Sequence, residues 1–336
     1  MSKKALDNAK NAKYDEFYTQ FNDIGNEVLS YDLDQFRDKV VLCPCDDPTE
    51  SNFTLFFAKN FKRLGLRKLI STGYKKDGHG KKYELTGDTN GDGVINQHDI
   101  VATDLEGDGD FNSDEVKELR DEADIICTNP PFSLFVEFVK WILEANKKFL
   151  ILGTVNAIAY KDVWQLIFSG NCWLGARHIN TDMYFDVPDA YKVILVDTKQ
   201  EGSSYVIHDS IVMAKLRNCC WFTNMDHRAR HETLTLLPKA INEASGVTYV
   251  TYDNYDAIEV PELRLIPSDY DGIMGVPISF LDKYNPDQFE LVGMFTGGNG
   301  VGFIPGSATP IASGKYTTAP VINKQKVYAR ILIKNK

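Results

Sequence analysis

The stretch Asn129-Pro130-Pro131-Phe132 combines residue types that suit binding and activating a planar amine. Two consecutive prolines fix the backbone and remove N–H donors, so the turn presents mainly carbonyl oxygens. The side-chain oxygen of Asn129 and the carbonyl of Pro130 can accept the two N–H bonds of an exocyclic amine, while Phe132 can stack on the attached ring. These contacts would push the amine nitrogen toward a tetrahedral, nucleophilic geometry. A proline-ended strand in an ordinary loop would show the same four letters.

The elements around this turn predict that it lies at a ligand-binding edge. Apolar runs at 39–45, 67–74, 123–129 and 147–153 predict buried strands. Between them, residues 51–65 predict a helix opened by Ser51 and closed by Gly65, Ser113 predicts the cap of a short helix, and 135–143 carry one apolar helical face. This alternation predicts an α/β fold, a doubly wound, Rossmann-like parallel sheet, with ligands beyond the carboxyl ends of its strands.

Past Ala157 the pattern changes to short β-like runs, "MYFDV", "CCWFTN", "VTYVTY", "FELVG" and "KVYARILI", with the Gly/Pro-rich connection "TGGNGVGFIPGSATP". We expect the earliest runs to finish the first sheet and the later ones to form a second, β-rich domain. The predicted domains are 1–235 and 236–336, with an acidic insertion at about 83–110 in the first. The boundary falls between His231 and Ala240.

Charge is unevenly distributed along this chain of net charge −10. From Tyr83 to Asp124 there are fourteen Asp or Glu and two Lys or Arg, whereas Leu291 to Lys336 holds six basic residues and no acidic one. The basic stretch suits contact with phosphates, although solvated lysines near a C-terminus are equally ordinary. No apolar run reaches membrane length and the start lacks a secretory core, so we expect a cytoplasmic protein, with its six cysteines reduced.

Two acidic stretches resemble calcium loops of the EF-hand kind. "DLEGDGDFNSDE" (104–115) has acids at its first, third, fifth and twelfth positions and glycine at its sixth. "DTNGDGVINQHD" (88–99) has glycine at the same place and metal-ligand residue types at five positions, Asp88, Asn90, Asp92, Asn96 and Asp99. Only four residues separate the two, too few for the helices that pair EF-hands. Whether the stretch at 88–99 binds calcium stays open, and we assign no metal site.

Several blocks in order resemble the EcoRI-type adenine-specific DNA methyltransferase family: "DEFYTQ", "CDDPTESNF", "GDGDF", "ADIICTNPPFSLF", "CWFTN" and "GVPISFLDKYNPDQFE". They spread over most of the chain. The resemblance implies a methyltransferase sheet followed by a β-rich target-recognition domain, and transfer of a methyl group from S-adenosylmethionine to adenine N6. It implies that Asn129, Pro130, Pro131 and Phe132 form the target-base pocket.

The resemblance also implies which residues hold the cofactor. Tyr18 and Thr19 would line its methionine end, and Cys45, Asp46 and Asp47 would wrap it in the turn after the first strand. Asp110 and Phe111 would bind the adenine amine and pack on its ring. The chain departs from the wider methyltransferase pattern in two places, since the glycine-rich turn is missing and the strand at 67–74 ends without an acidic residue for the ribose.

The implied partner is double-stranded DNA, from which the target adenine must be flipped out. Arg228 and Arg230 in "DHRARHE", with Lys324, Lys326 and Arg330 near the C-terminus, are the candidate DNA contacts. A charged surface turn explains Arg228 and Arg230 equally well.

The alternatives are methylation of RNA adenine or of a protein glutamine, and, from another class, a calcium-dependent binding module. We expect a monomer. The sequence leaves open the DNA site that is recognised and whether a cognate restriction endonuclease acts on the same site.

Overall fold

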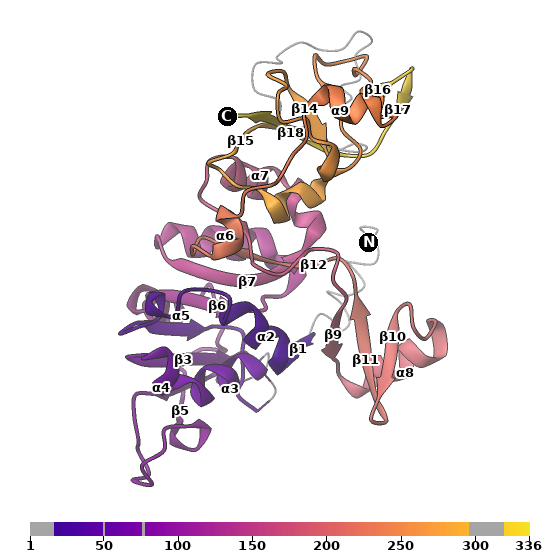
Figure 1. The fold of residues 1–336 in the computed structure, drawn as a ribbon. Coiled ribbons are helices and arrows are strands. Elements are labelled where there is room, and N and C mark those ends of the chain that lie inside the picture. The colour runs from indigo at the N-terminus through magenta and orange to yellow at the C-terminus, as the bar shows by residue number, and fades with distance from the viewer. Residues whose placement is uncertain (1–16, 50, 76–77, 296–318) are drawn as a thin grey trace. The chain divides into compact units, whose positions relative to one another are not determined.

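The computed structural model describes residues 17–49, 51–75, 78–295 and 319–336 (Figure 1). The chain divides into two compact units, one of Met1–Val155 with Gly175–Asp226 and one of Asn156–Leu174 with His227–Lys336. The second unit therefore includes a segment from the middle of the chain. The assignment of catalysis and target recognition to separate domains stays a prediction.

The first unit is built on a large mixed sheet in which the strands run in the order β5-β4-β3-β2-β6-β7-β12. The central strands are parallel: β2 (Val40–Cys43), β3 (Lys68–Gly73), β6 (Ile125–Thr128) and β7 (Lys148–Thr154). The flanking strands are antiparallel: β4 (Lys81–Leu85), β5 (Val101–Asp104) and β12 (Cys219–Thr223).

The α/β class is thus confirmed, but the sheet that was predicted as parallel is mixed, with antiparallel strands at both flanks. The connection from β3 to β4 is too short for a crossover helix, and a short connection joins only antiparallel neighbours. All residues of β2 and β6 are buried, as expected for strands with both faces covered.

The helices of this unit start at the predicted caps. Ser51 accepts a hydrogen bond from the Phe53 N–H at the start of α3 (Asn52–Lys59), and Ser113 caps α5 (Asp114–Glu122) in the same way. The predicted helix at 51–65 is interrupted at Asn60, so that a separate α4 (Phe61–Leu64) ends at Gly65 with a left-handed φ of 64°. The remaining helices of the large-sheet region are α2 (Phe21–Val28) and α6 (Phe135–Glu144).

A smaller antiparallel sheet of the first unit has the order β1-β9-β11-β10. Its strands are β1 (Tyr18–Thr19), β9 (Met183–Asp186), β11 (Ile211–Leu216) and β10 (Tyr205–His208), and α8 (Asp189–Thr198) follows β9. "CCWFTN" joins the large sheet as predicted, but "MYFDV" does not. This segment forms β9 and pairs with β1 instead. The register of the pairing places Tyr18 opposite Asp186.

The second unit contains a sheet of order β13-β14-β18-β15 and the hairpin β16–β17. The bounds are β13 (Ile258–Glu259), β14 (Met274–Val276), β15 (Phe289–Phe295), β16 (Val321–Ile322), β17 (Gln325–Lys326), β18 (Arg330–Asn335), β8 (Trp173–Leu174), α7 (Lys161–Phe168) and α9 (Lys239–Ala244).

Two predicted strands of this unit are corrected. "VTYVTY" forms no strand and only an isolated bridge at Thr251, and "KVYARILI" is divided between β17 and β18. The Gly/Pro-rich connection at 296–310 lies outside the described residues. Within the described ranges, no helix is long and apolar enough to cross a membrane.

The acidic insertion extends the large sheet by β4 and β5, which are joined by an outer loop of residues 86–100. Its carboxylates bind the loop's own backbone. Asp88 accepts from the N–H groups of Gly91 and Gly93, at 2.6 and 2.8 Å, and Asp99 accepts from three further N–H groups. Among the described residues, no three His, Cys, Asp or Glu side chains are grouped to hold a metal ion. The outer loop is thus closed by hydrogen bonds to its own backbone.

Candidate active site

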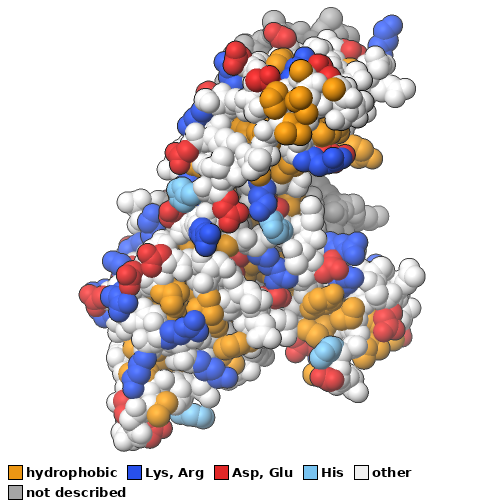
Figure 2. All heavy atoms as spheres, in the orientation of Figure 1, with side chains coloured by type: hydrophobic (Ala, Val, Ile, Leu, Met, Phe, Trp, Pro, Cys, Tyr) orange, Lys and Arg blue, Asp and Glu red, His pale blue; other side chains and the backbone are white. Residues whose placement is uncertain are grey.

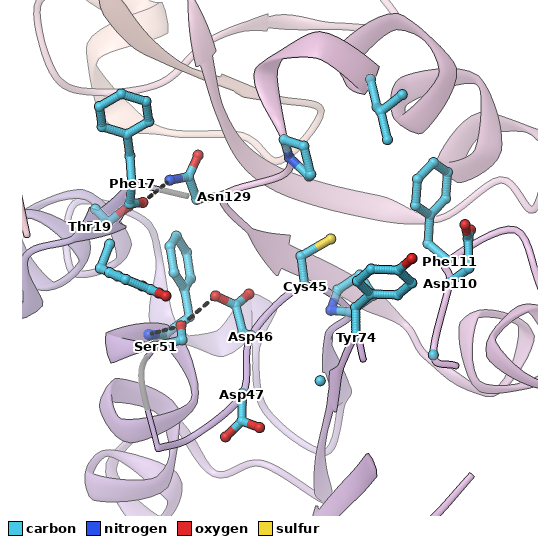
Figure 3. A pocket seen from close by; sticks show the side chains of 17 residues that line it. Phe17, Thr19, Cys45, Asp46, Asp47, Ser51, Tyr74, Asp110, Phe111 and Asn129 are labelled. Carbon is cyan, nitrogen blue, oxygen red and sulfur yellow. Dashed lines mark hydrogen bonds between the residues drawn. The ribbon is translucent and has the colours of Figure 1, made fainter. Parts of the chain in front are cut away.

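A cavity of about 340 Å³ lies at the carboxyl ends of β2, β3 and β6 (Figure 3). This is the edge at which open α/β sheets bind ligands, and the volume suits a small organic molecule. Segments far apart in the chain supply its walls: Phe17, Tyr18, Thr19, Pro44, Cys45, Asp46, Asp47, Ser51, Phe53, Gly73, Tyr74, Gly109, Asp110, Phe111, Asn129, Pro131 and Leu134. All seven predicted cofactor residues are in this set, together with Asn129 and Pro131.

The side-chain amide of Asn129 is held in one orientation. Its Nδ2 donates a 2.6 Å hydrogen bond to the backbone carbonyl of Phe17, which is drawn in Figure 3. A carbonyl oxygen can only accept, so the amide nitrogen must face Phe17 and Oδ1 must point away from it. Oδ1 is buried and has no hydrogen-bond partner among the described residues. The wall of the cavity therefore presents one oriented, unsatisfied acceptor.

The rest of the Asn-Pro-Pro-Phe turn supports this amide. Pro130 is buried, and the carbonyl of Pro131 accepts from the Leu134 N–H at 2.9 Å, which closes the single-turn helix η3 (Phe132–Leu134). The half-buried ring of Phe132 does not line the cavity itself. It lies 6.1 Å from the ring of Phe17, centroid to centroid, with 18° between their planes.

Asp46 follows β2, lines the cavity and is buried. Ser51 donates to one of its carboxylate oxygens, and Thr128 donates to the other at 2.5 Å. Burial raises the pKa of Asp46 to about 7, an effect that the two hydroxyl donors partly offset. Because Thr128 directly precedes Asn129, this carboxyl group links the turn after β2 to the turn after β6.

Asp47 is fixed at the adjacent position. One oxygen accepts from the N–H and hydroxyl of Thr49, and the other accepts from the Tyr83 hydroxyl at 3.0 Å. A Cβ at Gly73, the last residue of β3, would lie only 2.8 Å from the Asp47 carboxylate. The Asp47 carboxylate therefore occupies the end of the strand that lacks an acidic residue of its own.

The stretch 104–115, here called the pocket loop, places two predicted residues at the opposite wall. Phe111 is 6% exposed and packs edge-on against Phe138 and Trp141 of α6. Asp110 is exposed, and its carboxylate accepts from the Asn112 N–H at 2.8 Å. Gly109 has a φ of 84°, and a Cβ there would lie 2.7 Å from the Gly73 carbonyl oxygen. Only glycine fits this close approach to β3.

The strand β1 supplies Tyr18 and Thr19. Thr19 is 3% exposed, and its hydroxyl has no hydrogen-bond partner within the part of the chain that the structure describes. Its backbone carbonyl accepts from the Asn52 side chain at 2.8 Å, which ties β1 to the start of α3. A second unsatisfied polar atom thus lies in the cavity wall.

The predicted DNA contacts have different surroundings in the second unit. Arg228 is exposed on the single-turn helix η5 (Arg228–His231), whereas the guanidinium of Arg230 lies 3.7 Å from the centroid of the Trp173 ring. Lys324 and Lys326 are exposed on the β16–β17 hairpin.

Arg330 has an internal partner. Its guanidinium forms a 2.5 Å ion pair with Glu259, and both side chains are only 14% exposed. The Tyr252 hydroxyl also donates to Glu259. A phosphate would have to displace this carboxylate, so Arg330 is not retained among the proposed DNA contacts.

Several residues that the sequence reasoning did not assign to the site contribute to it, among them Phe17, Ser51, Tyr83 and Thr128. Ser51 is predicted only as a helix cap. Tyr83 carries no sequence signal, because its contact with Asp47 depends on the antiparallel pairing of β4 with β3. Phe17, Ser51 and Thr128 lie in the blocks that carry the family resemblance, and that position is the signal that was available.

Comparisons with known proteins agree with this geometry. A family model described as "Adenine-specific methyltransferase EcoRI" matches residues 5–336. Type II methyltransferase M.EcoRI of Escherichia coli is 41% identical over 99% of this chain and 97% of its own length. Type II methyltransferases M.MpnI of Mycoplasma pneumoniae and M.MgeORF184P of Mycoplasma genitalium are 39% and 36% identical, each over 84% of this chain and 83% and 84% of their own lengths.

No solved structure matches the chain. The family model matches nearly the whole chain, and the Escherichia coli enzyme is similar over nearly its full length. Both findings confirm the family resemblance inferred from the sequence blocks. The chain therefore belongs to the EcoRI family of adenine-specific methyltransferases and is a DNA adenine methyltransferase.

Proposed function

We propose that this enzyme methylates the N6 amine of an adenine flipped out of duplex DNA, with Asn129 as the residue that binds and activates the amine. The observation that supports this most directly is the amide of Asn129. Its nitrogen is held by the Phe17 carbonyl, and its oxygen is buried in the cavity wall without a partner among the described residues. Such an acceptor suits a ligand that brings N–H donors.

The chain's own residues would then act on the amine. Asn129 Oδ1 accepts one N–H bond and the carbonyl of Pro130 accepts the other, which localises the nitrogen lone pair and stabilises the positive charge that develops on nitrogen during transfer. S-adenosylmethionine, when bound, supplies an electrophilic methyl group. Transfer would form the N–C bond as the S–C bond of the donor breaks to leave a neutral thioether, and the amine would release one proton, so no nucleophile from the protein and no covalent enzyme intermediate are needed.

The cavity residues suit S-adenosylmethionine. The unpartnered hydroxyl of Thr19 can bind a polar group at the methionine end, near Tyr18 and Cys45. The Asp47 carboxylate lies at the end of β3, where a ribose-binding acid is otherwise missing. Asp110 and Phe111 offer a carboxylate and a ring edge to the adenine. Asp46 would organise this floor through Ser51 and Thr128.

The second unit is proposed to recognise the DNA target. Its exposed cations Arg228, Lys324 and Lys326 are available to phosphates or base edges, and the β16–β17 hairpin is narrow enough to enter a groove. Contacts of this kind would offset the few kcal/mol needed to flip the base. We further propose that the enzyme acts as a cytoplasmic monomer in a restriction-modification system, together with a nuclease of the same specificity.

Substitution of Asn129 by alanine tests this assignment. Transfer of a labelled methyl group to duplex DNA should fall by about a hundredfold or more, because the acceptor for the amine is lost. S-adenosylmethionine affinity, measured by calorimetry, should change little. Asn26→Ala, on the exposed face of α2, is the matched control and should retain full activity. Activity within a few fold of the wild type in Asn129→Ala would refute the assignment.

A further inference from the structure

Phe17 contacts the catalytic turn through both its backbone and its side chain. It directly precedes β1, and its carbonyl orients the Asn129 amide. Figure 3 shows its ring and the amide oxygen of Asn129 pointing to the same side, away from Asp46 and Asp47. The ring and the acceptor that the proposed function gives to the target amine therefore point to the same side of the site. The sequence pattern assigned no role to this residue.

The orientation of the Phe17 ring is fixed by two aromatic neighbours. Phe185 of β9 meets it at 5.8 Å and 79°, and Tyr191 of α8 meets it at 5.9 Å and 85°. Both contacts are edge-to-face, so the two neighbours restrain the ring. The ring of Phe132 is the third neighbour and is nearly parallel to that of Phe17.

Near-parallel rings are the arrangement needed to hold a flat base between them. We infer that Phe17 forms the second wall of the target-adenine slot, opposite Phe132. Two stacking contacts need about 7 Å between the outer rings, whereas these centroids are 6.1 Å apart. One ring must therefore shift by roughly 1 Å. Phe132 is the ring that moves, because it lies on a single helical turn, while Phe185 and Tyr191 restrain Phe17.

The slot couples stacking of the flipped adenine to placement of its amine beside Asn129, and the reaction needs both. A flipped adenine loses its stacking in the duplex, and two aromatic faces restore it. Because the residue that supplies one face also orients Asn129, a base that stacks on Phe17 has its amine beside Oδ1. This inference rests on the proposed role of Asn129.

Replacing the Phe17 side chain tests the slot without removing the carbonyl that orients Asn129. In Phe17→Ala, the single-turnover rate of methyl transfer to a paired target adenine should fall by about tenfold to a hundredfold, the range expected for a lost stacking contact. A duplex in which the target adenine is mispaired should recover a large part of this loss, because that base is easier to extrude. Phe17→Tyr should remain within about threefold of the wild type, since it keeps the ring.

Three comparisons make the result decisive. Unchanged S-adenosylmethionine affinity shows that the variant is folded, and Phe17→Leu replaces it if the alanine variant fails that check. Tyr160→Ala removes an exposed aromatic side chain outside the cavity lining and should not alter the rate. A rate for Phe17→Ala within threefold of the wild type, or no recovery on the mispaired duplex, would overturn the inference. Loss of activity in Asn129→Ala would stand in either case, which separates this failure from failure of the proposed function.

Discussion

The outer loop and the pocket loop have similar sequences and different surroundings. Both are rich in aspartate and glycine, and both match a calcium-loop pattern in their letters. The outer loop connects β4 to the edge strand β5 and binds mostly its own backbone. The pocket loop is joined to the β3–β4 connection, since Lys75 and Gly80 donate to the carbonyls of Asp108 and Gly107, both at 2.8 Å. That connection brings Asp110 and Phe111 to the cavity.

The difference shows that position relative to the sheet edge, more than composition, decides what an acidic loop does. Aspartates in a loop of this kind satisfy nearby N–H groups wherever they are. Only the loop that returns past the carboxyl end of a central strand also reaches a ligand site. Matched substitutions in the two loops therefore measure how much a loop's position relative to the sheet edge contributes to stability and to cofactor binding.

The largest difference is expected between Gly109→Ala and Gly93→Ala. The two glycines have almost the same φ, 84° and 81°, so alanine has a similar backbone cost at both. At Gly93 nothing lies within 4 Å of an added Cβ, and the free energy of unfolding should fall by only about 1 to 2 kcal/mol. At Gly109 the clash with the Gly73 carbonyl should raise the loss to about 3 kcal/mol or more and abolish cofactor binding.

Urea unfolding and calorimetric titration with S-adenosylmethionine would measure both quantities. Equal losses of the free energy of unfolding in the two variants would show that the pocket loop is free to move away from β3.

A smaller difference is expected between Asp110→Ala and Asp92→Ala. Each carboxylate accepts from the N–H group two residues ahead, so each variant loses the same local bond. Only Asp110 lines the cavity, and its removal should weaken S-adenosylmethionine binding by about tenfold, as expected for one charged hydrogen bond. Asp92→Ala should bind and methylate normally, with or without a calcium chelator. Loss of methylation on chelation would instead show that the outer loop has a metal-dependent role.

The remaining effects are pH-dependent and opposite in sign. Burial raises the pKa of Asp46 to about 7, so the folded state holds this proton more tightly than the unfolded chain, and its contribution to stability is lost as pH rises from about 4 to 7. Hydrogen bonds from the backbone of Asn96, and then of Thr89 and Asn90, lower the pKa of Asp99 below 3.8. Its contribution is therefore lost as pH falls below that value.

Urea unfolding across this pH range, for the wild type and for Asp46→Asn and Asp99→Asn, would measure both effects. Asp46→Asn should remove the loss of stability between about pH 4 and 7. Asp99→Asn should weaken the loss of stability below pH 3.8. A change of the same sign in both variants would contradict the assignment.

The sequence predicted the central strands and their caps because those signals are local. Buried apolar runs, Ser51 and Ser113 as caps, and Gly65 as a left-handed terminator all depend on a few neighbouring residues. The antiparallel strands at the flanks of the sheet were not predicted, since strand direction there depends on connection lengths and long-range pairing. The pairing of residues 183–186 with β1 is such a case.

The candidate site likewise contains residues with a local sequence signal and residues whose contacts depend on long-range pairing. Contiguous motifs brought Asn129, Asp46 and Asp47 to attention because each follows a predicted strand, and Asp110 because it matches an Asp-Phe pair of the family. Phe17 was given no role, because its two contacts with the catalytic turn join residues more than a hundred positions apart. For Arg330, the basic stretch gave no sign that Glu259 would pair with it.

The pairing of β1 with β9 also has a consequence for biosynthesis. The segment that orients Asn129 and carries Thr19 is made before its partner β9, which ends at Asp186, past the midpoint of the 336-residue sequence. Contacts of such long range form late in folding. A ribosome-bound or truncated fragment that ends before β9 can already contain the Asn-Pro-Pro-Phe turn. In such a fragment β1 has no partner strand, so the side-chain amide of Asn129 would not be held in place. The order of synthesis delays activity until most of the first unit has emerged.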